Sequence, residues 1–82
     1  MTANIIDILE EAQRVYNREM SYFDDYSNET DEEMKQIYWT RSNEYSGKCE
    51  GLLTAYEIIT GRCIMNYDID NEISYQKSKL TH

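Results

Sequence analysis

Apolar side chains recur every three or four positions over residues 3–26, the spacing that places them on one face of an α-helix. This face comprises Ile5, Leu9, Ala12, Tyr16, Met20 and Phe23, and it is widened by Ile8, Val15 and Tyr26. Most positions between them are charged or carry amides, so the other face suits water. The pattern therefore predicts an amphipathic helix over residues 3–26.

A second helical pattern covers residues 30–60, and signals for a helix start and a helix end flank it. Thr30 and Glu33 stand three positions apart, as in a capping box, in which each side chain accepts a hydrogen bond from the other residue's backbone amide. Gly61 suits the left-handed position that follows many helices. The apolar face between these ends comprises Met34, Tyr38, Tyr45, Cys49, Leu52, Tyr56 and Ile59. We therefore expect one long helix over residues 30–60.

Two features of this second helix each admit two explanations. Gly47, Gly51 and Ala55 step down one side of it, where they either allow a bend or let another helix approach closely. Trp39 projects from the polar side. It is either an ordinary exposed aromatic or an anchor for a partner, because tryptophan is frequent among the residues that dominate binding energy at interfaces.

The link between the two helices, around residues 27–29, is so short that the helices have to pair antiparallel as a hairpin. The expected register places Tyr16 near Arg41. Glu19 and Arg41 are charged residues that intrude on the apolar faces, and this register brings them within about one helical turn of each other. We therefore predict a partly buried ion pair between Glu19 and Arg41, which fixes the register more than it stabilises the fold.

Helical spacing returns near the end of the chain, at Ile69, Ile73 and Leu80. Acidic residues come first in this segment and basic residues last, which is the order that the helix dipole favours. This predicts a short third helix packed across the hairpin. The expected fold class is all-α, with a hairpin of residues 3–26 and 30–60 and a short C-terminal helix in a single domain, residues 1–82.

The predicted core is small and weakly apolar. The chain has 82 residues, and tyrosine, of which there are eight, methionine and alanine make up much of its apolar faces. A chain of this length buries only a limited core as a monomer. We therefore expect a homo-oligomer, in which two hairpins pair into a four-helix bundle, or a hairpin that completes its core on a different protein.

The negative charge is concentrated at the turn of the hairpin. The formal net charge is −8, and the segment 19–33 holds seven acids and no base: Glu19, Asp24, Asp25, Glu29, Asp31, Glu32 and Glu33. This distribution argues against direct nucleic-acid binding and against attachment to an anionic membrane, since both need a basic surface. A calcium loop starting at Asp24 or Asp25 lacks the alternating acids and the central glycine. The acids are thus either a solvated helix end or a docking surface for a basic groove.

The residues that enzymes use are scarce, so we expect neither catalysis nor a cofactor nor a metal site. The sequence has no glycine-rich phosphate loop, and its single histidine, His82, is the last residue. Cys49 and Cys63 form no C-x-x-C pair and have no neighbouring histidine to activate them. There is no leader-like segment and no apolar run of the roughly 20 residues that span a membrane, so we expect a reduced, cytoplasmic protein.

The run YSGKCEGLLTAYEIITGR, residues 45–62, resembles a pattern found in small helical proteins of phages and mobile elements of Gram-positive bacteria. The resemblance implies an accessory protein of the anti-CRISPR-like class, some of whose members block a host nucleic-acid-binding enzyme by presenting carboxylates to its basic cleft. It carries over no functional residue. From the charge pattern we expect partner contacts at Asp24, Asp25, Glu29, Asp31, Glu32, Glu33 and Trp39. The alternative is a self-associating structural or assembly module.

Overall fold

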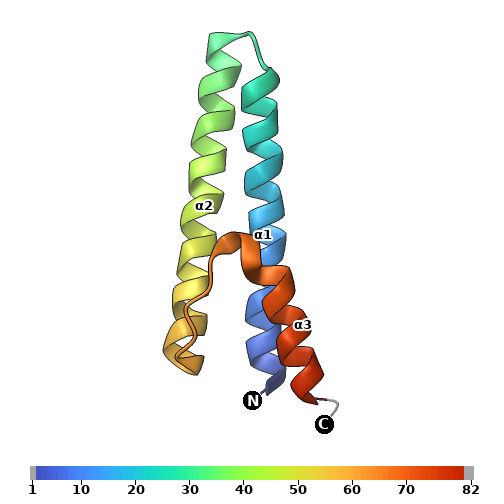
Figure 1. Cartoon of the computed structure of the whole chain (residues 1–82). Coiled ribbons are helices and arrows are strands. Elements are labelled where there is room, and N and C mark those ends of the chain that lie inside the picture. The colour runs from blue at the N-terminus through green and yellow to red at the C-terminus, as the bar shows by residue number, and fades with distance from the viewer. Residues whose placement is uncertain (1, 81–82) are drawn as a thin grey trace.

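The structure is a computed structural model that describes residues 2–80. This part of the chain contains α1 (Thr2–Asn28), α2 (Glu32–Thr60), a short 3₁₀ turn η1 (Asn66–Asp68) and α3 (Ile69–Leu80), and no strand. Helices α1 and α2 form an antiparallel hairpin, and the linker after α2 runs back up along it before α3 descends beside α1 (Figure 1). The predicted all-α fold, a long hairpin with a short C-terminal helix, is confirmed.

The start of α2 differs from the predicted capping box. The N-cap residue is Asp31 and not Thr30: the Asp31 carboxylate accepts hydrogen bonds from the backbone amides of Glu33, at 2.9 Å, and Met34, at 3.4 Å. Glu29 Oε1 accepts from the amides of Thr30 and Asp31, each at 3.0 Å. Both Thr and Asp are good N-cap residues, but a carboxylate also interacts favourably with the positive end of the helix dipole. This favours Asp31.

From this cap, α2 runs as one continuous helix to Thr60. Gly61 follows in the predicted left-handed conformation, with φ 74°, and its amide donates to the carbonyl of Glu57 at 2.7 Å. The helix passes through Gly47 and Gly51 without interruption. Both glycines are exposed, and a Cβ added at either would meet no atom within 4 Å. Within residues 2–80 they therefore make no close helix contact.

The core lies in the half of the hairpin that α3 covers. Its buried apolar residues are Ile6, Leu9, Ala12 and Val15 of α1, Cys49 and Tyr56 of α2, and Ile69 of α3. The structure describes every residue from Met20 to Arg41, and none of them is buried. We call this two-helix segment, residues 20–41, the distal arm. It makes the molecule long, with extents of 52 × 20 × 16 Å.

Several residues assigned to the apolar faces are in fact exposed. Ile59 has 58% of its surface exposed, and the exposed fractions of Met20 and Phe23 are 40% and 42%. Conversely, Ile6 is buried although it stands outside the predicted face. The face on α1 therefore contributes to the core only up to about Val15, because α3 does not reach the distal arm to cover the rest.

The predicted register is wrong by about one helical turn. The Ser42 hydroxyl donates to the carbonyl of Glu19 and the Cys49 thiol to that of Ala12, which places these residues opposite each other across the hairpin. Arg41 accordingly lies over the Tyr22 ring, 5.8 Å from its centroid, and not near Tyr16. The predicted Glu19–Arg41 ion pair is also wrong. The Oε1 atom of Glu19 is buried and has no hydrogen-bond partner among the described residues.

Candidate functional site

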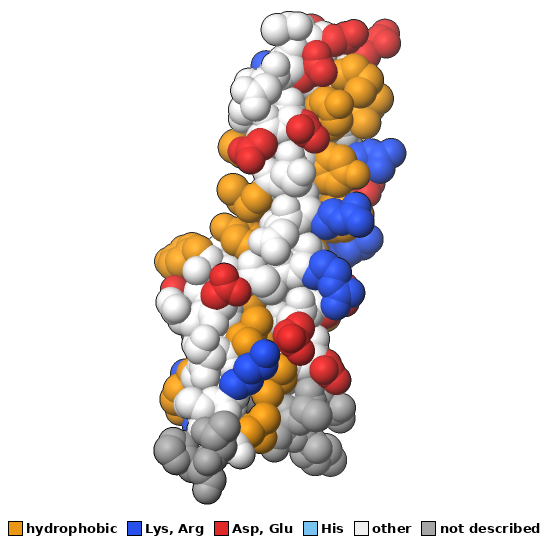
Figure 2. Space-filling view, turned by 90° about the vertical axis from the view of Figure 1, so that its right-hand side faces the viewer, with side chains coloured by type: hydrophobic (Ala, Val, Ile, Leu, Met, Phe, Trp, Pro, Cys, Tyr) orange, Lys and Arg blue, Asp and Glu red, His pale blue; other side chains and the backbone are white. Residues whose placement is uncertain are grey.

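The six acidic residues expected to contact a partner gather at the closed end of the hairpin, which we call the acidic end. Asp24 and Asp25 lie in the last turns of α1, Glu29 and Asp31 in the link, and Glu32 and Glu33 in the first turn of α2. Figure 2 shows acidic side chains crowded at this end of the molecule. Five of the six are exposed, and Glu29 is half-buried.

The carboxylates of the acidic end fall into two groups. Those of Glu29 and Asp31 accept backbone hydrogen bonds and hold the turn and the start of α2. The other four, on Asp24, Asp25, Glu32 and Glu33, make no hydrogen bond or ion pair within residues 2–80. An exposed carboxylate without a partner in its own chain can attract and pair with an approaching cation. These four are therefore the side chains of the site that remain available for binding.

Trp39 lies beside the acidic end and belongs to a cluster of rings. Its ring centroid is 5.3 Å from that of Tyr26, which in turn is 6.1 Å from that of Phe23. Lys35 Nζ sits 5.0 Å from the centre of the Tyr26 ring. Trp39 and Phe23 each expose 42% of their surface. We call Phe23, Tyr26 and Trp39 the aromatic cluster; it offers apolar contact area next to the free carboxylates.

A second group of side chains forms a surface that the sequence did not predict. Tyr22 of α1 stacks on Tyr45 of α2, with ring centroids 5.7 Å apart, and lies 6.4 Å from Tyr38. The Lys48 ammonium lies 4.9 Å from the centre of the Tyr45 ring, and Arg41 covers Tyr22. Arg14 and Arg18 line one shallow depression with Tyr45. We call this surface the basic tyrosine strip: Arg14, Arg18, Tyr22, Tyr38, Arg41, Tyr45 and Lys48.

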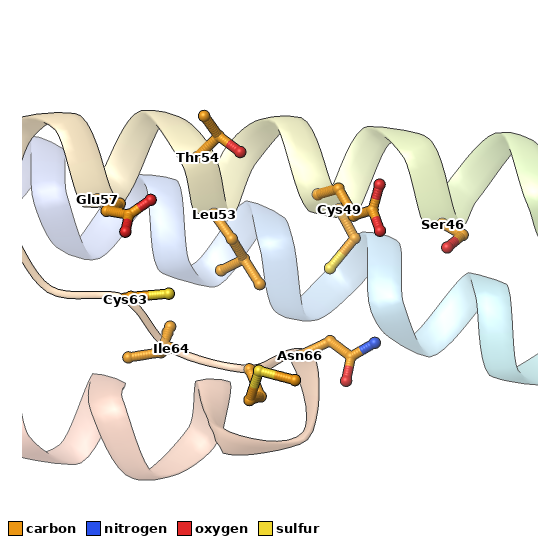
Figure 3. A pocket seen from close by; sticks show the side chains of 10 residues that line it. Ser46, Cys49, Leu53, Thr54, Glu57, Cys63, Ile64 and Asn66 are labelled. Atoms are coloured by element: carbon orange, nitrogen blue, oxygen red, sulfur yellow. The ribbon is translucent and has the colours of Figure 1, made fainter.

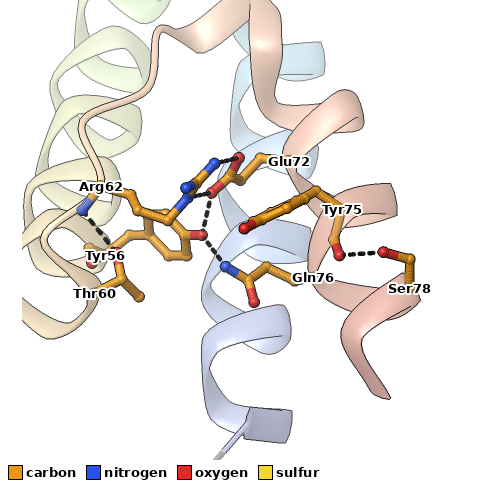
Figure 4. A network of polar contacts seen from close by, with 7 residues as sticks. All are labelled: Tyr56, Thr60, Arg62, Glu72, Tyr75, Gln76 and Ser78. Carbon is orange, nitrogen blue, oxygen red and sulfur yellow. Dashed lines mark hydrogen bonds and ion pairs between the residues drawn. The ribbon is translucent and has the colours of Figure 1, made fainter. Parts of the chain in front are cut away.

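A buried polar network joins α3 to the end of α2 (Figure 4). Glu72, 6% exposed, accepts hydrogen bonds from Arg62 Nε at 2.5 Å and Arg62 Nη2 at 3.0 Å, and from the Tyr56 hydroxyl. Gln76 Nε2 donates to the Tyr56 hydroxyl at 2.8 Å. The Arg62 hydrogen bonds hold the pKa of Glu72 below its usual value, although burial acts in the opposite direction. Every member is satisfied, so the network serves as a structural link.

Both cysteines line a groove of about 350 Å³ between α2 and the linker (Figure 3). Both are free; Cys49 is buried and Cys63 is exposed. Burial raises the pKa of the Cys49 thiol, and a hydrogen bond to the Glu57 carboxylate raises that of Cys63. Because the thiolate is the reactive form of cysteine, these shifts make both side chains poor nucleophiles.

Within residues 2–80, no group of three or more His, Cys, Asp or Glu side chains is arranged to hold a metal ion. None of the described helices combines the length and the apolar composition that crossing a membrane requires. Comparison of the chain with models of protein families, with curated proteins and with solved structures finds no match.

Proposed function

We propose that this protein is a non-enzymatic inhibitor of phage or mobile-element type, which places its acidic end in the basic groove of a host nucleic-acid-binding enzyme. The observation that carries the proposal is the set of four exposed carboxylates, on Asp24, Asp25, Glu32 and Glu33, that make no hydrogen bond or ion pair within residues 2–80. Closely spaced carboxylates resemble the negative phosphates of a nucleic acid, so they can bind the Lys and Arg side chains that line a nucleic-acid groove.

The shape of the distal arm suits insertion into a groove. It is only two helices thick, and the molecule's two shorter extents are 20 and 16 Å. The carboxylates would speed association and set orientation, since complementary charge acts mainly on the on-rate and on specificity. The aromatic cluster would add affinity, because large rings that become buried at an interface dominate binding energy. Charge and apolar anchor thus lie on the same end of the molecule.

The test is capture from host lysate by immobilised protein, with variants of matched charge. One variant reverses the four free carboxylates, Asp24→Lys, Asp25→Lys, Glu32→Lys and Glu33→Lys. The control reverses four exposed acids elsewhere, Asp7→Lys, Glu44→Lys, Glu50→Lys and Glu57→Lys. We expect the wild type and the control to retain a nucleic-acid-binding protein and the first variant to lose it. The captured protein, once purified, should lose its nucleic-acid binding when the wild type is added.

Two results would contradict the proposal. The first is a variant with all four carboxylates reversed that captures the same protein at full strength. The second is a captured protein whose nucleic-acid binding is unaffected by saturating wild type. The alternative function, a self-associating assembly module, is favoured by a different observation: the distal arm contains no buried residue, so its apolar side chains gain most from a further layer of helices.

A further inference from the structure

The chain carries a basic surface although its net charge is −8. Four of its eight Lys and Arg residues, Arg14, Arg18, Arg41 and Lys48, belong to the basic tyrosine strip. Arg14 pairs with Glu11 at 2.8 Å. The other three make no ion pair with any described residue, in a chain that has sixteen acids. Because these three cations have no ion-pair partner although the chain is rich in carboxylates, their surface is suited to bind an acidic partner.

The order of side chains along the hairpin identifies that partner. Along one edge of the molecule, Figure 2 shows acidic side chains at the hairpin end, hydrophobic ones beneath them and Lys and Arg further down. Tyr22 stands between Arg18 and Asp24 along α1, and Tyr38 stands between Glu33 and Arg41 along α2; the two rings lie 6.4 Å apart. Ile37, which is 44% exposed, lines a shallow depression with Arg41. A face with an apolar middle and opposite charges at its two ends is complementary to itself after rotation by 180°.

We propose that two copies of this chain pair through this face as an antiparallel, two-fold symmetric dimer, with the acidic end of each copy on the basic tyrosine strip of the other. A two-fold axis at the level of Tyr22 and Tyr38 brings the turn of one hairpin over Arg18, Tyr45 and Lys48 of its partner. The distal arms then overlap, and the two-helix arm becomes a layer of a four-helix bundle. The inference rests on the strip and not on the proposed inhibition.

The net charge sets the conditions of the test. Two copies of charge −8 repel each other at long range, whereas the acid–base contacts across the interface act over a few ångströms. At about 150 mM salt the screening length is about 8 Å, so the long-range repulsion is damped more than the local pairs. The oligomeric state is therefore measured by sedimentation equilibrium at this one salt concentration, and variants rather than salt decide the outcome.

Two variants of equal charge separate the strip from the rest of the surface. The strip variant is Arg41→Glu with Lys48→Glu, each of which removes a cation from a tyrosine ring. The control is Lys77→Glu with Lys79→Glu, two exposed residues of α3 that lie outside the distal arm. Since each reversal changes the charge by two, both variants carry −12 in place of −8. Circular dichroism checks that both keep the helix content of the wild type.

We expect the wild type and the control to be dimers at micromolar concentration and the strip variant to be a monomer, its dissociation constant raised at least about tenfold. A third variant, Asp24→Lys with Asp25→Lys, should also be a monomer. Its lysines stand in the last turns of α1, where the dipole favours cations. When the two monomeric variants are mixed, each supplies the charge that the other now needs, and a heterodimer should form.

Three results would overturn the dimer: a monomeric wild type, a strip variant that dimerises as the wild type does, or two variants that stay monomeric when mixed. The proposed inhibition fails separately. The strip variant keeps all the carboxylates of the acidic end, so it should still capture the host enzyme whether or not it dimerises. If the strip variant dimerises normally but captures nothing, the dimer and the inhibition are both contradicted, each by its own readout.

Discussion

Glu19 is a charged residue in an unfavourable environment. Its Oε1 atom is buried without a hydrogen-bond partner among the described residues, and burial, followed by repulsion from Glu50, raises its pKa. When the pKa of a carboxyl group is higher in the folded than in the unfolded state, protonation of that group stabilises the folded state. Its stabilising contribution is therefore complete below its unfolded value, 4.5, and is lost as pH rises through the folded value. At neutral pH the ionised Glu19 destabilises the hairpin.

We accordingly predict that Glu19→Gln raises the melting temperature at pH 7 by roughly 3 °C, because it removes a poorly solvated charge. Below pH 4.5, where the native carboxyl is already neutral, the gain should disappear. Thermal unfolding followed by circular dichroism at the two pH values measures both effects. The exposed Glu44→Gln serves as the control and should change little. A fall in melting temperature for Glu19→Gln at pH 7 would show that the carboxylate has a stabilising partner.

Glu72 presents the opposite case, because the hydrogen bonds from Arg62 lower its pKa. A lowered pKa gives a stabilisation that is present above the unfolded value, 4.5, and is lost as pH falls through the folded value. We predict that Glu72→Gln destabilises the protein by about 1–3 kcal/mol at pH 7. The loss is smaller than for a fully buried ion pair, because the Arg62 side chain is 42% exposed and water screens its charge. Urea unfolding at pH 7 and pH 3 tests this. Equal losses at both pH values would mean that the charge of Glu72 contributes nothing.

At the level of the helices, the sequence predicts more about boundaries than about pairing. The 3.6-residue period locates α1 and α2, and Gly61 marks the end of α2, because these signals are local. The start of α2 was displaced by one residue since Thr30 and Asp31 are both good caps. The register is a different matter: sliding one helix by a turn keeps both apolar faces together. The Glu19–Arg41 pair is absent for another reason: Ser42 donates to the carbonyl of Glu19, so Arg41 starts at nearly the same level, but its guanidinium lies over the Tyr22 ring.

Substitutions at the three glycines of the chain test two features of α2: its continuity through Gly47 and Gly51, and the left-handed conformation of Gly61 at its end. Gly61 has φ 74°, a conformation that costs other residues about 1 kcal/mol or more, so Gly61→Ala should destabilise the protein by that amount. Gly47→Ala and Gly51→Ala should each stabilise it by about 0.5–1 kcal/mol, since both glycines are inside the helix and an added Cβ meets open space. Urea unfolding measures all three. A stabilising Gly61→Ala would contradict the left-handed cap.

For the whole molecule, the acidic end was predictable and the basic tyrosine strip was not. The acids of the first follow one another in the sequence, so their gathering requires only that the chain turns there. The strip combines Arg14 and Arg18 of α1 with Arg41 and Lys48 of α2, and these meet only in the correct register. The Tyr56–Glu72–Gln76 network was equally hidden, because it depends on how α3 is placed beside α1 and the end of α2.

The uneven distribution of the core also predicts uneven stability along the hairpin. Local opening of the distal arm, residues 20–41, separates no buried residue from the rest, whereas opening of the other half exposes Leu9, Ala12, Cys49 and Tyr56. In a dilute sample, we therefore expect backbone amides of the distal arm to exchange with deuterium at least about tenfold faster than those around Leu9 and Tyr56. Hydrogen exchange read by mass spectrometry resolves the two halves.

The same exchange experiment, repeated at several protein concentrations, tests whether a second copy of the chain covers the distal arm. If the arms of two copies overlap, protection of residues 20–41 should rise with protein concentration in the wild type and not in Arg41→Glu with Lys48→Glu, because only a bound partner supplies the missing layer. Protection around Leu9 should stay constant in both, since α3 already covers that half. Uniform protection along α1 in a dilute sample would mean that the two-helix arm is as stable as the core, and that its exposed rings need no partner to hold it together.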